Sequence, residues 1–335
     1  ASRERLEQVE LPPFRAAVEA GVGAVMTAHI YLPGLEPEAG LPATLSPAMT
    51  AGLLRRELGF QGLVFTDALT MQGVAARFTP EEVAVRAVKA GADILLIPVD
   101  IEKTVSALKR AVESGEITKE QLDASVKRIL EAKARLGLHR QRFADLERLE
   151  AEIGALPHQR LARTMIERAL TLVRDEKSSL PLRLADNQRL LYINLLDSRR
   201  GWVEGMPGRA FRDELLRRHA NTVDVQLDDA TSKDAFDILR KLAGTSDAIV
   251  VSGFIRVAAY KGSIDLSQWQ LELLRDLSKL DKPLIFTLFG SPYLLSFVPE
   301  LPAYALAFED YPEAERAMVR AVFGEIPFTG HLPIS

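Results

Sequence analysis

Residues 59–71, with the sequence GFQGLVFTDALTM, are the stretch that decides the fold. The glycines at 59 and 62 bracket a turn, and the apolar run of residues 63–65 follows it. A short apolar run with helical patterns on both sides is typical of a buried parallel strand. This strand ends in Thr66 and Asp67, so it places a carboxylate at its carboxyl end. In α/β folds that end binds ligands and presents catalytic side chains.

Position alone leaves Asp67 with two interpretations. It can carry function, or it can simply cap the next helix, since Asp is a favoured N-cap residue. His29 is placed in the same way, because it ends the apolar run of residues 23–28. A histidine at such a position is often a hydrogen-bonding structural residue, and its functional alternative needs further support.

The pattern on either side of this stretch predicts an α/β protein of two domains. Apolar runs at 24–28, 63–66 and 94–97 alternate with helical segments, one of which begins with a capping box formed by Thr79 and Glu82. The polar stretch 138–157 contains little strand signal, which favours an interdomain connection. The second half repeats the alternation and predicts a doubly wound, largely parallel sheet with helices on both faces. Its strands are expected at 170–174, 190–196, 223–227, 247–252, 283–288 and 303–308.

Composition excludes several classes of function. The 335 residues carry a net charge of −4 and no basic block, which argues against a nucleic-acid partner. Cysteine is absent and the five histidines are scattered, so we expect no metal site. No apolar run approaches the roughly 20 residues needed to span a bilayer. No glycine-rich nucleotide-binding motif follows any expected strand, and we expect no cofactor.

The stretch 58–71 resembles the nucleophile segment of glycoside hydrolase family 3, in which the aspartate of a (T/S)-D-x-(L/M)-x-M pattern forms the glycosyl-enzyme. The segments VMTAH at 25–29, PATLS at 42–46 and GADILL at 91–96 resemble the same family, and the combination is most like its β-N-acetylglucosaminidase branch. The resemblance implies that residues 1–140 are the last three β/α units of a (β/α)₈ barrel. Residues 141–165 would then connect this part to an αβα sandwich domain at 166–335.

The resemblance also implies an activity and its site residues. Asp67 would be the nucleophile of a retaining hydrolase acting on terminal β-linked sugars, above all a β-N-acetylhexosaminidase. His29 would contact the substrate or the nucleophile, and Met71 would either lie along the sugar or pack in the core. The family alternatives are β-glucosidases, other exo-β-glycosidases and enzymes that transfer the sugar to phosphate. A non-catalytic binding or scaffold module is a further alternative.

The same resemblance implies that residues 1–140 are incomplete. The family's histidine–aspartate proton donor and its early strands would precede residue 1, so they are expected in another chain or in a segment outside this numbering. We therefore expect three strands in place of eight, with the side that carries Val25, Val64 and Leu95 abnormally open. His29 and Asp67 should lie near each other at one end of these strands. The TDAL form of the motif resembles envelope-associated bacterial members, which favours the cell envelope or secretion over the cytoplasm.

Overall fold

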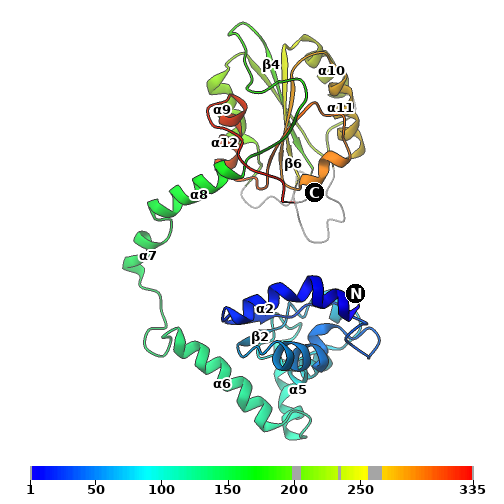
Figure 1. Cartoon of the computed structure of the whole chain (residues 1–335), viewed down its shortest axis with the longest axis vertical. Coiled ribbons are helices and arrows are strands. Elements are labelled where there is room, and N and C mark those ends of the chain that lie inside the picture. Colours follow the sequence, from blue (N-terminus) through cyan, green and yellow to red (C-terminus); the bar gives the residue numbers. More distant parts are fainter. Residues whose placement is uncertain (1, 198–204, 233–234, 256–265, 334–335) are drawn as a thin grey trace. The chain divides into compact units, whose positions relative to one another are not determined.

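The computed structural model describes residues 2–197, 205–232, 235–255 and 266–333 (Figure 1). The chain divides into two compact units, Ala1–Leu146 and Glu147–Ser335. No helix in these described ranges is both long enough and apolar enough to cross a membrane.

The first unit is mostly helical. The predicted capping box is confirmed at its fourth α-helix, where Thr79 and Glu82 bond each other's backbone N–H groups. The helical elements of this unit, where η denotes a π- or 3₁₀-helix, are α1 (Arg3–Arg5), η1 (Leu6–Glu10), α2 (Leu11–Glu19), η2 (Ala43–Leu45), η3 (Ala48–Glu57), α3 (Gln72–Ala75), α4 (Pro80–Ala90), α5 (Ile101–Glu113) and α6 (Lys119–Arg135).

Two short parallel strands, β1 (Ala24–Met26) and β2 (Leu63–Phe65), form the sheet of this unit. The third strand that the sequence predicts at 94–97 is reduced to a single bridge between Phe65 and Ile94, so that expectation is wrong in extent. The reason is a single hydrogen bond beyond the bridge: the backbone N–H of Leu96 donates to the Thr66 hydroxyl at 2.9 Å. A side chain takes the place of the backbone carbonyl that a continued ladder would use.

The open side of these strands is the opposite of the expected one. Val64 is fully buried, and Val25 and Leu95 pack against the same apolar cluster. The exposed side instead carries Met26, which is 53% exposed. Because side chains alternate along a strand, a shift of one residue exchanges the two faces. The side predicted to be open is therefore the one that packs onto the helices.

The second unit contains a six-stranded sheet in the order β3-β8-β7-β6-β4-β5. All neighbouring strands are parallel except β3, which pairs antiparallel with β8. Every residue of β4 and of β6 is buried, as expected for central parallel strands with both faces covered. The strands are β3 (Thr171–Asp175), β4 (Leu190–Leu196), β5 (Thr222–Leu227), β6 (Ala248–Phe254), β7 (Leu284–Phe289) and β8 (Ala303–Ala307).

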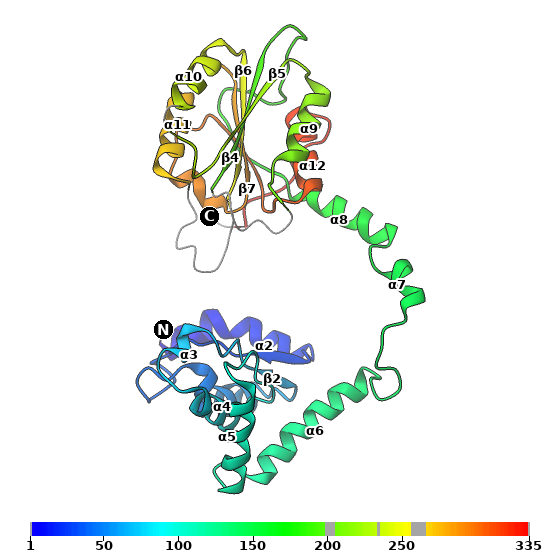
Figure 2. The ribbon, with the colours of Figure 1, turned by 180° about the vertical axis from the view of Figure 1, so that it is seen from behind.

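Helices cover both faces of this sheet, as Figures 1 and 2 show. One apolar cluster joins the sheet to α9 (Arg209–Arg218) and α12 (Pro312–Val322). The other cluster joins the opposite face to α10 (Ala235–Thr245), α11 (Gln268–Ser278) and the short η4 (Pro292–Ser296). An α/β architecture with a mostly parallel sheet is thereby confirmed.

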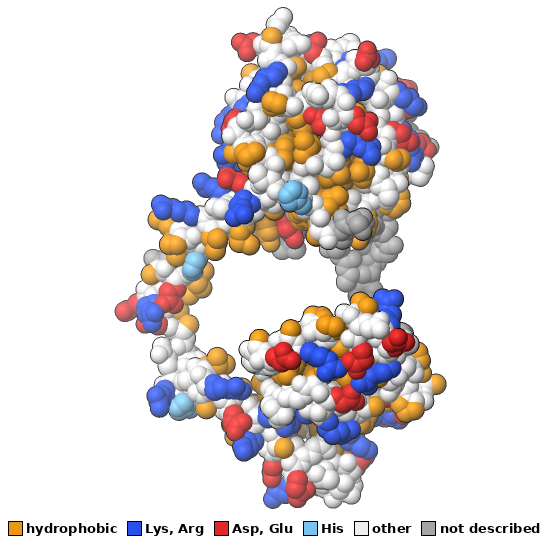
Figure 3. Space-filling model, in the orientation of Figure 1, with side chains coloured by type: hydrophobic (Ala, Val, Ile, Leu, Met, Phe, Trp, Pro, Cys, Tyr) orange, Lys and Arg blue, Asp and Glu red, His pale blue; other side chains and the backbone are white. Residues whose placement is uncertain are grey.

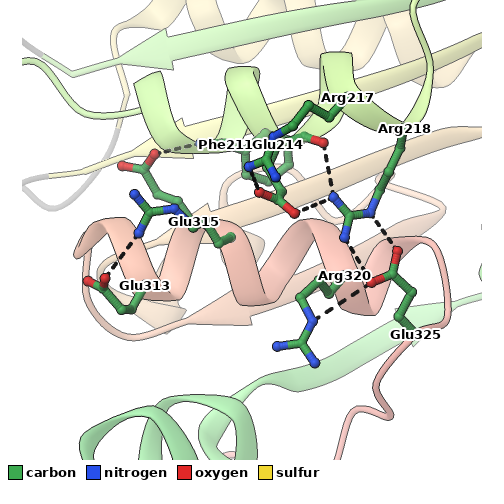
Figure 4. A network of polar contacts seen from close by, with 9 residues as sticks. Phe211, Glu214, Arg217, Arg218, Glu313, Glu315, Arg320 and Glu325 are labelled. Atoms are coloured by element: carbon green, nitrogen blue, oxygen red, sulfur yellow. Dashed lines mark hydrogen bonds and ion pairs between the residues drawn. The ribbon is translucent and has the colours of Figure 1, made fainter. Parts of the chain in front are cut away.

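A polar network links α9 to α12 (Figure 4). The carboxylate of Glu315 accepts hydrogen bonds from the backbone N–H groups of Gly208 and Phe211 at 3.0 and 2.8 Å, so α12 caps the first turn of α9. Arg218 bonds both Glu214 of its own helix and Glu325 beyond α12. Burial raises the pKa of Glu315, although the backbone donors oppose that shift.

Two helices, α7 (Leu146–Glu152) and α8 (Leu156–Ala169), lead into the second sheet. Arg320 of α12 donates to the Glu167 carboxylate of α8 at 2.7 Å, which fastens the end of α8 to α12. The other side of α8 is apolar and open, with Leu161 and Met165 58% and 62% exposed. Hydrophobic side chains are visible along both helices in the space-filling view (Figure 3).

Candidate active site

Asp67 is the second residue after β2, at the carboxyl end of the strand, as the sequence predicts. Its neighbour Thr66 is fully buried, and the Thr66 backbone N–H donates to the carbonyl of Ile94 at 3.0 Å. Two residues further on, the N–H of Leu69 donates to the carbonyl of Leu96 at 2.9 Å. Asp67 is thus held from both sides, while its own side chain is only half-buried.

Asp67 does not cap the helix that follows it. That helix, α3, begins at Gln72 and has Met71 as its N-cap residue. The Asp67 carboxylate instead accepts a hydrogen bond at 2.7 Å from the backbone N–H of Ala68, the next residue. The capping interpretation is therefore wrong for α3, and a partly exposed carboxylate stands on a turn after a strand.

His29 lies against the segment that carries Asp67. Its Nε2 is 3.0 Å from the carbonyl oxygen of Ala68, and its Nδ1 is 2.8 Å from the hydroxyl of Thr44. The expected proximity of His29 to the Asp67 turn is confirmed at the level of this backbone contact. Both ring nitrogens are bonded within the protein, so neither is free for a sugar hydroxyl in this arrangement.

Met71 closes the turn after Asp67. Its backbone N–H donates to the same Ala68 carbonyl at 3.0 Å. Its side chain is 36% exposed, so the alternative that Met71 simply packs in the core is wrong. The exposed Met71 side chain thus lies on the turn that begins at Asp67, where it offers apolar surface at this end of the strands.

The polar partners around His29 were not singled out from the sequence. Thr44 lies in η2 and is fully buried, and its hydroxyl meets both His29 and the hydroxyl of Thr27, which is 3.0 Å away. Thr44 belongs to the PATLS segment, where it is the polar residue in a short apolar stretch. A polar residue inside an apolar run needs a hydrogen-bond partner when it is buried. This requirement is the sequence feature that could have drawn attention to Thr44.

Asp93 is a second unforeseen residue. It lies in the GADILL segment, and its carboxylate is completely buried. One oxygen accepts from Arg55 at 2.7 Å and from the backbone N–H of Val64 at 2.9 Å. The other accepts from Ser125 at 2.8 Å and from two nitrogens of Arg128 at 3.0 and 2.7 Å.

This ion cluster fixes the start of β2. Arg55 also donates to the carbonyl of Gly62 at 3.1 Å, which is the last residue of the turn before the strand. Burial lowers the pKa of Arg55, and the charge of Asp93 opposes that shift. Asp93 therefore joins η3, β2 and α6. It fixes the position of β2, and Asp67 follows the other end of this strand.

Within the described ranges, no group of three or more His, Cys, Asp and Glu side chains could hold a metal ion. The chemistry that these residues offer is that of a carboxylate nucleophile or base on a fixed turn, which is supported by hydrogen bonds from the peptide group of Ala68 and, through it, from His29.

Comparison with known proteins places this site in a family. The family model described as "Glycosyl hydrolase family 3 N terminal domain" matches residues 1–132, which include Asp67, His29 and Met71. A "Beta-N-acetylglucosaminidase/beta-glucosidase" of Cellulomonas fimi is 28% identical over 352 residues, covering 96% of this chain and 59% of the relative. A "Beta-hexosaminidase A" of Pseudoalteromonas piscicida is 33% identical over 214 residues, covering 58% of this chain and 35% of the relative.

A solved structure extends the similarity to both units. The glycoside hydrolase family 3 β-N-acetylglucosaminidase of Paenibacillus sp. str. FPU-7 is 31% identical and superposes with a TM-score of 0.83. The superposition covers 99% of this chain and 62% of that protein, so the chain spans about a third to three fifths of these relatives. The family match, the relatives and the shared fold agree: residues 1–132 match the N-terminal domain model of glycoside hydrolase family 3, and the chain as a whole is similar to enzymes of that family.

Proposed function

We propose that this chain is the nucleophile-bearing part of a retaining β-glycosidase, with Asp67 as the nucleophile. The observation that carries the proposal is the half-buried Asp67 carboxylate, which stands at the carboxyl end of β2 without capping a helix. Retaining hydrolysis needs such a carboxylate on one face of the anomeric carbon and a proton donor for the leaving group. Met71 supplies an apolar contact beside it.

We propose a terminal β-linked N-acetylhexosamine as the substrate. Support comes from the names of the relatives, one of which is a hexosaminidase and one a β-N-acetylglucosaminidase. The second candidate is a β-glucoside, because the relative from Cellulomonas fimi is named for both activities. Relatives named as β-xylosidases leave other exo-β-glycosidase activities as the next alternative.

The proton donor and the remaining strands are proposed to come from elsewhere, either from another chain or from protein outside residues 1–335. The His29 ring does not serve as this donor in the present arrangement, because both of its nitrogens are engaged. The sheet also has surface for a partner: Met26 of β1 is 53% exposed, and Ile97 beyond the bridge is 63% exposed. Additional barrel strands on this surface would cover apolar groups that otherwise favour association.

The test uses the complete enzyme and its Asp67→Asn variant. We expect the variant to keep its fold and to lose about 10³-fold or more in turnover of nitrophenyl β-N-acetylglucosaminide. The matched control is Asp123→Asn, a change of the same kind at an exposed position on α6, which should keep full activity. Parallel assays with the nitrophenyl β-glucoside and β-xyloside, each with and without added phosphate, show which of the alternative activities the enzyme has.

A 2-fluoro-sugar should form a covalent adduct on Asp67, located by mass spectrometry of peptides. An adduct on another carboxylate would reject the assignment of the nucleophile. Absence of turnover and of labelling in the complete enzyme, with all these substrates, would favour a non-catalytic module.

A further inference from the structure

The side chain of His29 is part of a chain of hydrogen bonds that reaches the Asp67 turn. Thr27 bonds Thr44 at 3.0 Å, Thr44 bonds Nδ1 of His29 at 2.8 Å, and Nε2 of His29 bonds the Ala68 carbonyl at 3.0 Å. The three side chains come from the end of β1 and from η2, and the carbonyl comes from the turn after β2.

The direction of every bond in this chain follows from its last acceptor. A carbonyl oxygen can only accept, so Nε2 of His29 must carry a hydrogen. In the neutral ring Nδ1 then has none and accepts from the Thr44 hydroxyl. Each hydroxyl has a single hydrogen to donate, so Thr44 in turn accepts from Thr27. With a neutral imidazole, these three hydrogen bonds therefore have only one consistent set of donors and acceptors.

The carbonyl at the end of this chain is at the centre of the candidate site. Ala68 donates its N–H to the Asp67 carboxylate at 2.7 Å, and its carbonyl accepts from both His29 and Met71. The residue next to Asp67 is therefore fixed on both of its peptide groups. A shift of the His29 ring would move the Ala68 carbonyl, and the Asp67 carboxylate would move with it.

Close packing also holds the backbone and the Cβ of His29. At Gly73, in α3, an added Cβ would lie 2.7 Å from the Cβ of His29 and 2.9 Å from its carbonyl oxygen. Such distances leave no space for a side chain, so α3 rests directly on His29. Thr44, which is bonded to Nδ1 of the ring, is fully buried. The packing therefore fixes the point from which the imidazole extends, and the hydrogen bonds at its two nitrogens orient the ring.

We propose that His29 is a positioning residue for Asp67, with its hydrogen on Nε2 toward the Ala68 carbonyl, and that Thr44 supports this tautomer by donating to Nδ1. The proposal rests on the proposed role of Asp67 as nucleophile. It chooses between the two roles that the sequence left open for His29, contact with the nucleophile segment and contact with the sugar. Positioning acts on the reacting carboxylate, so its loss changes turnover more than substrate binding.

The geometry is tested first, without any substrate. Histidine-specific ¹⁵N labelling of this chain gives ring spectra that distinguish the two tautomers, and His29→Gln assigns the His29 signal by its disappearance. We expect an Nε2–H ring that changes in Thr44→Val and returns in Thr44→Ser. An Nδ1–H ring in the unaltered chain overturns the proposal, whether or not any variant folds.

The catalytic consequence is tested in the complete enzyme. Thr44→Val should lower kcat and the rate of 2-fluoro-sugar labelling by about 10- to 100-fold, with KM changed by less than about threefold. Thr44→Ser, which restores the hydroxyl, should return kcat to within about threefold of the original. A raised KM with unchanged kcat would assign His29 to the sugar, and unchanged kinetics would also overturn the proposal. A failure of Asp67 labelling in the unaltered enzyme would reject the proposed function while leaving the tautomer result standing.

Discussion

Asp93 offers a sharp test of what holds the first unit together. Five donor atoms meet its carboxylate, which is completely buried, and the two arginines among them are only 17% and 25% exposed. Asp93→Asn keeps the shape but leaves both guanidinium groups without a counter-charge. Removing one partner of a buried ion pair typically costs about 3–5 kcal/mol. We expect a loss of about 3 kcal/mol in the free energy of unfolding of the first unit.

Urea titration with two probes separates the units. Both tryptophans of the chain, at positions 202 and 269, belong to the second unit, whereas far-ultraviolet circular dichroism reports on both. Asp93→Asn should move the transition seen by circular dichroism and leave the fluorescence transition in place. Ser125→Ala, which removes one neutral donor, should cost about 1 kcal/mol.

The matched control for Asp93 is a surface pair. Lys89 and Glu116 are 3.0 Å apart with side chains 43% and 49% exposed, so Glu116→Gln should cost less than about 1 kcal/mol. A loss below about 1 kcal/mol for Asp93→Asn, or an equal shift in the fluorescence transition, would refute the assignment of this cluster as the anchor of β2.

Three further changes test other parts of the structure. Gly62→Ala should destabilise the first unit by about 1–3 kcal/mol, measured by circular dichroism, because the new Cβ would lie 2.4 Å from the carbonyl oxygen of Gly23. Tyr304→Phe should leave the second unit equally stable or up to about 1 kcal/mol more stable in urea, since the buried hydroxyl has no partner among the described residues. The raised pKa of Glu315 means that the folded state binds a proton more readily than the unfolded state. The stabilisation that the protonated Glu315 side chain gives to the folded state is therefore full below about pH 4.3, and it is lost as pH rises through the folded-state pKa. Glu315→Gln should remove this pH dependence from the stability that tryptophan fluorescence reports.

The second sheet was well predicted because its four inner strands, β4, β6, β7 and β8, are buried along their whole length. Such strands read as continuous apolar runs, and the predicted run 190–196 coincides with β4 (Leu190–Leu196). The run 94–97 looks the same in the sequence but forms only one bridge. What ends it is a hydrogen bond from Leu96 to Thr66, 30 residues away, and no local pattern contains that contact.

The sequence predicted those residues of the candidate site that follow the end of a strand. Asp67 and His29 were found because each follows an apolar run, and the fold brings their segments together. Thr44 and Asp93 were missed because their roles depend on partners 15 to 38 residues away, which periodicity does not encode. The exposed side of β1 and β2 was also predicted wrongly. Because side chains alternate between the two faces of a strand, an assignment that is one residue out of phase selects the opposite face.

The two ends of β2 (Leu63–Phe65) are held by different kinds of interaction, and this division would allow the proposed nucleophile to be both fixed in place and reactive. Toward its start, the buried charges of Asp93, Arg55 and Arg128 hold the strand. At its carboxyl end, Asp67 is supported by hydrogen bonds, which are formed by the Ala68 peptide groups and the His29 ring. An arginine bonded directly to Asp67 would oppose the transfer of its negative charge into a glycosyl bond. The same cation placed at the other end of the strand supplies stability and leaves the carboxylate free to react, as parallel α/β folds generally separate the two tasks.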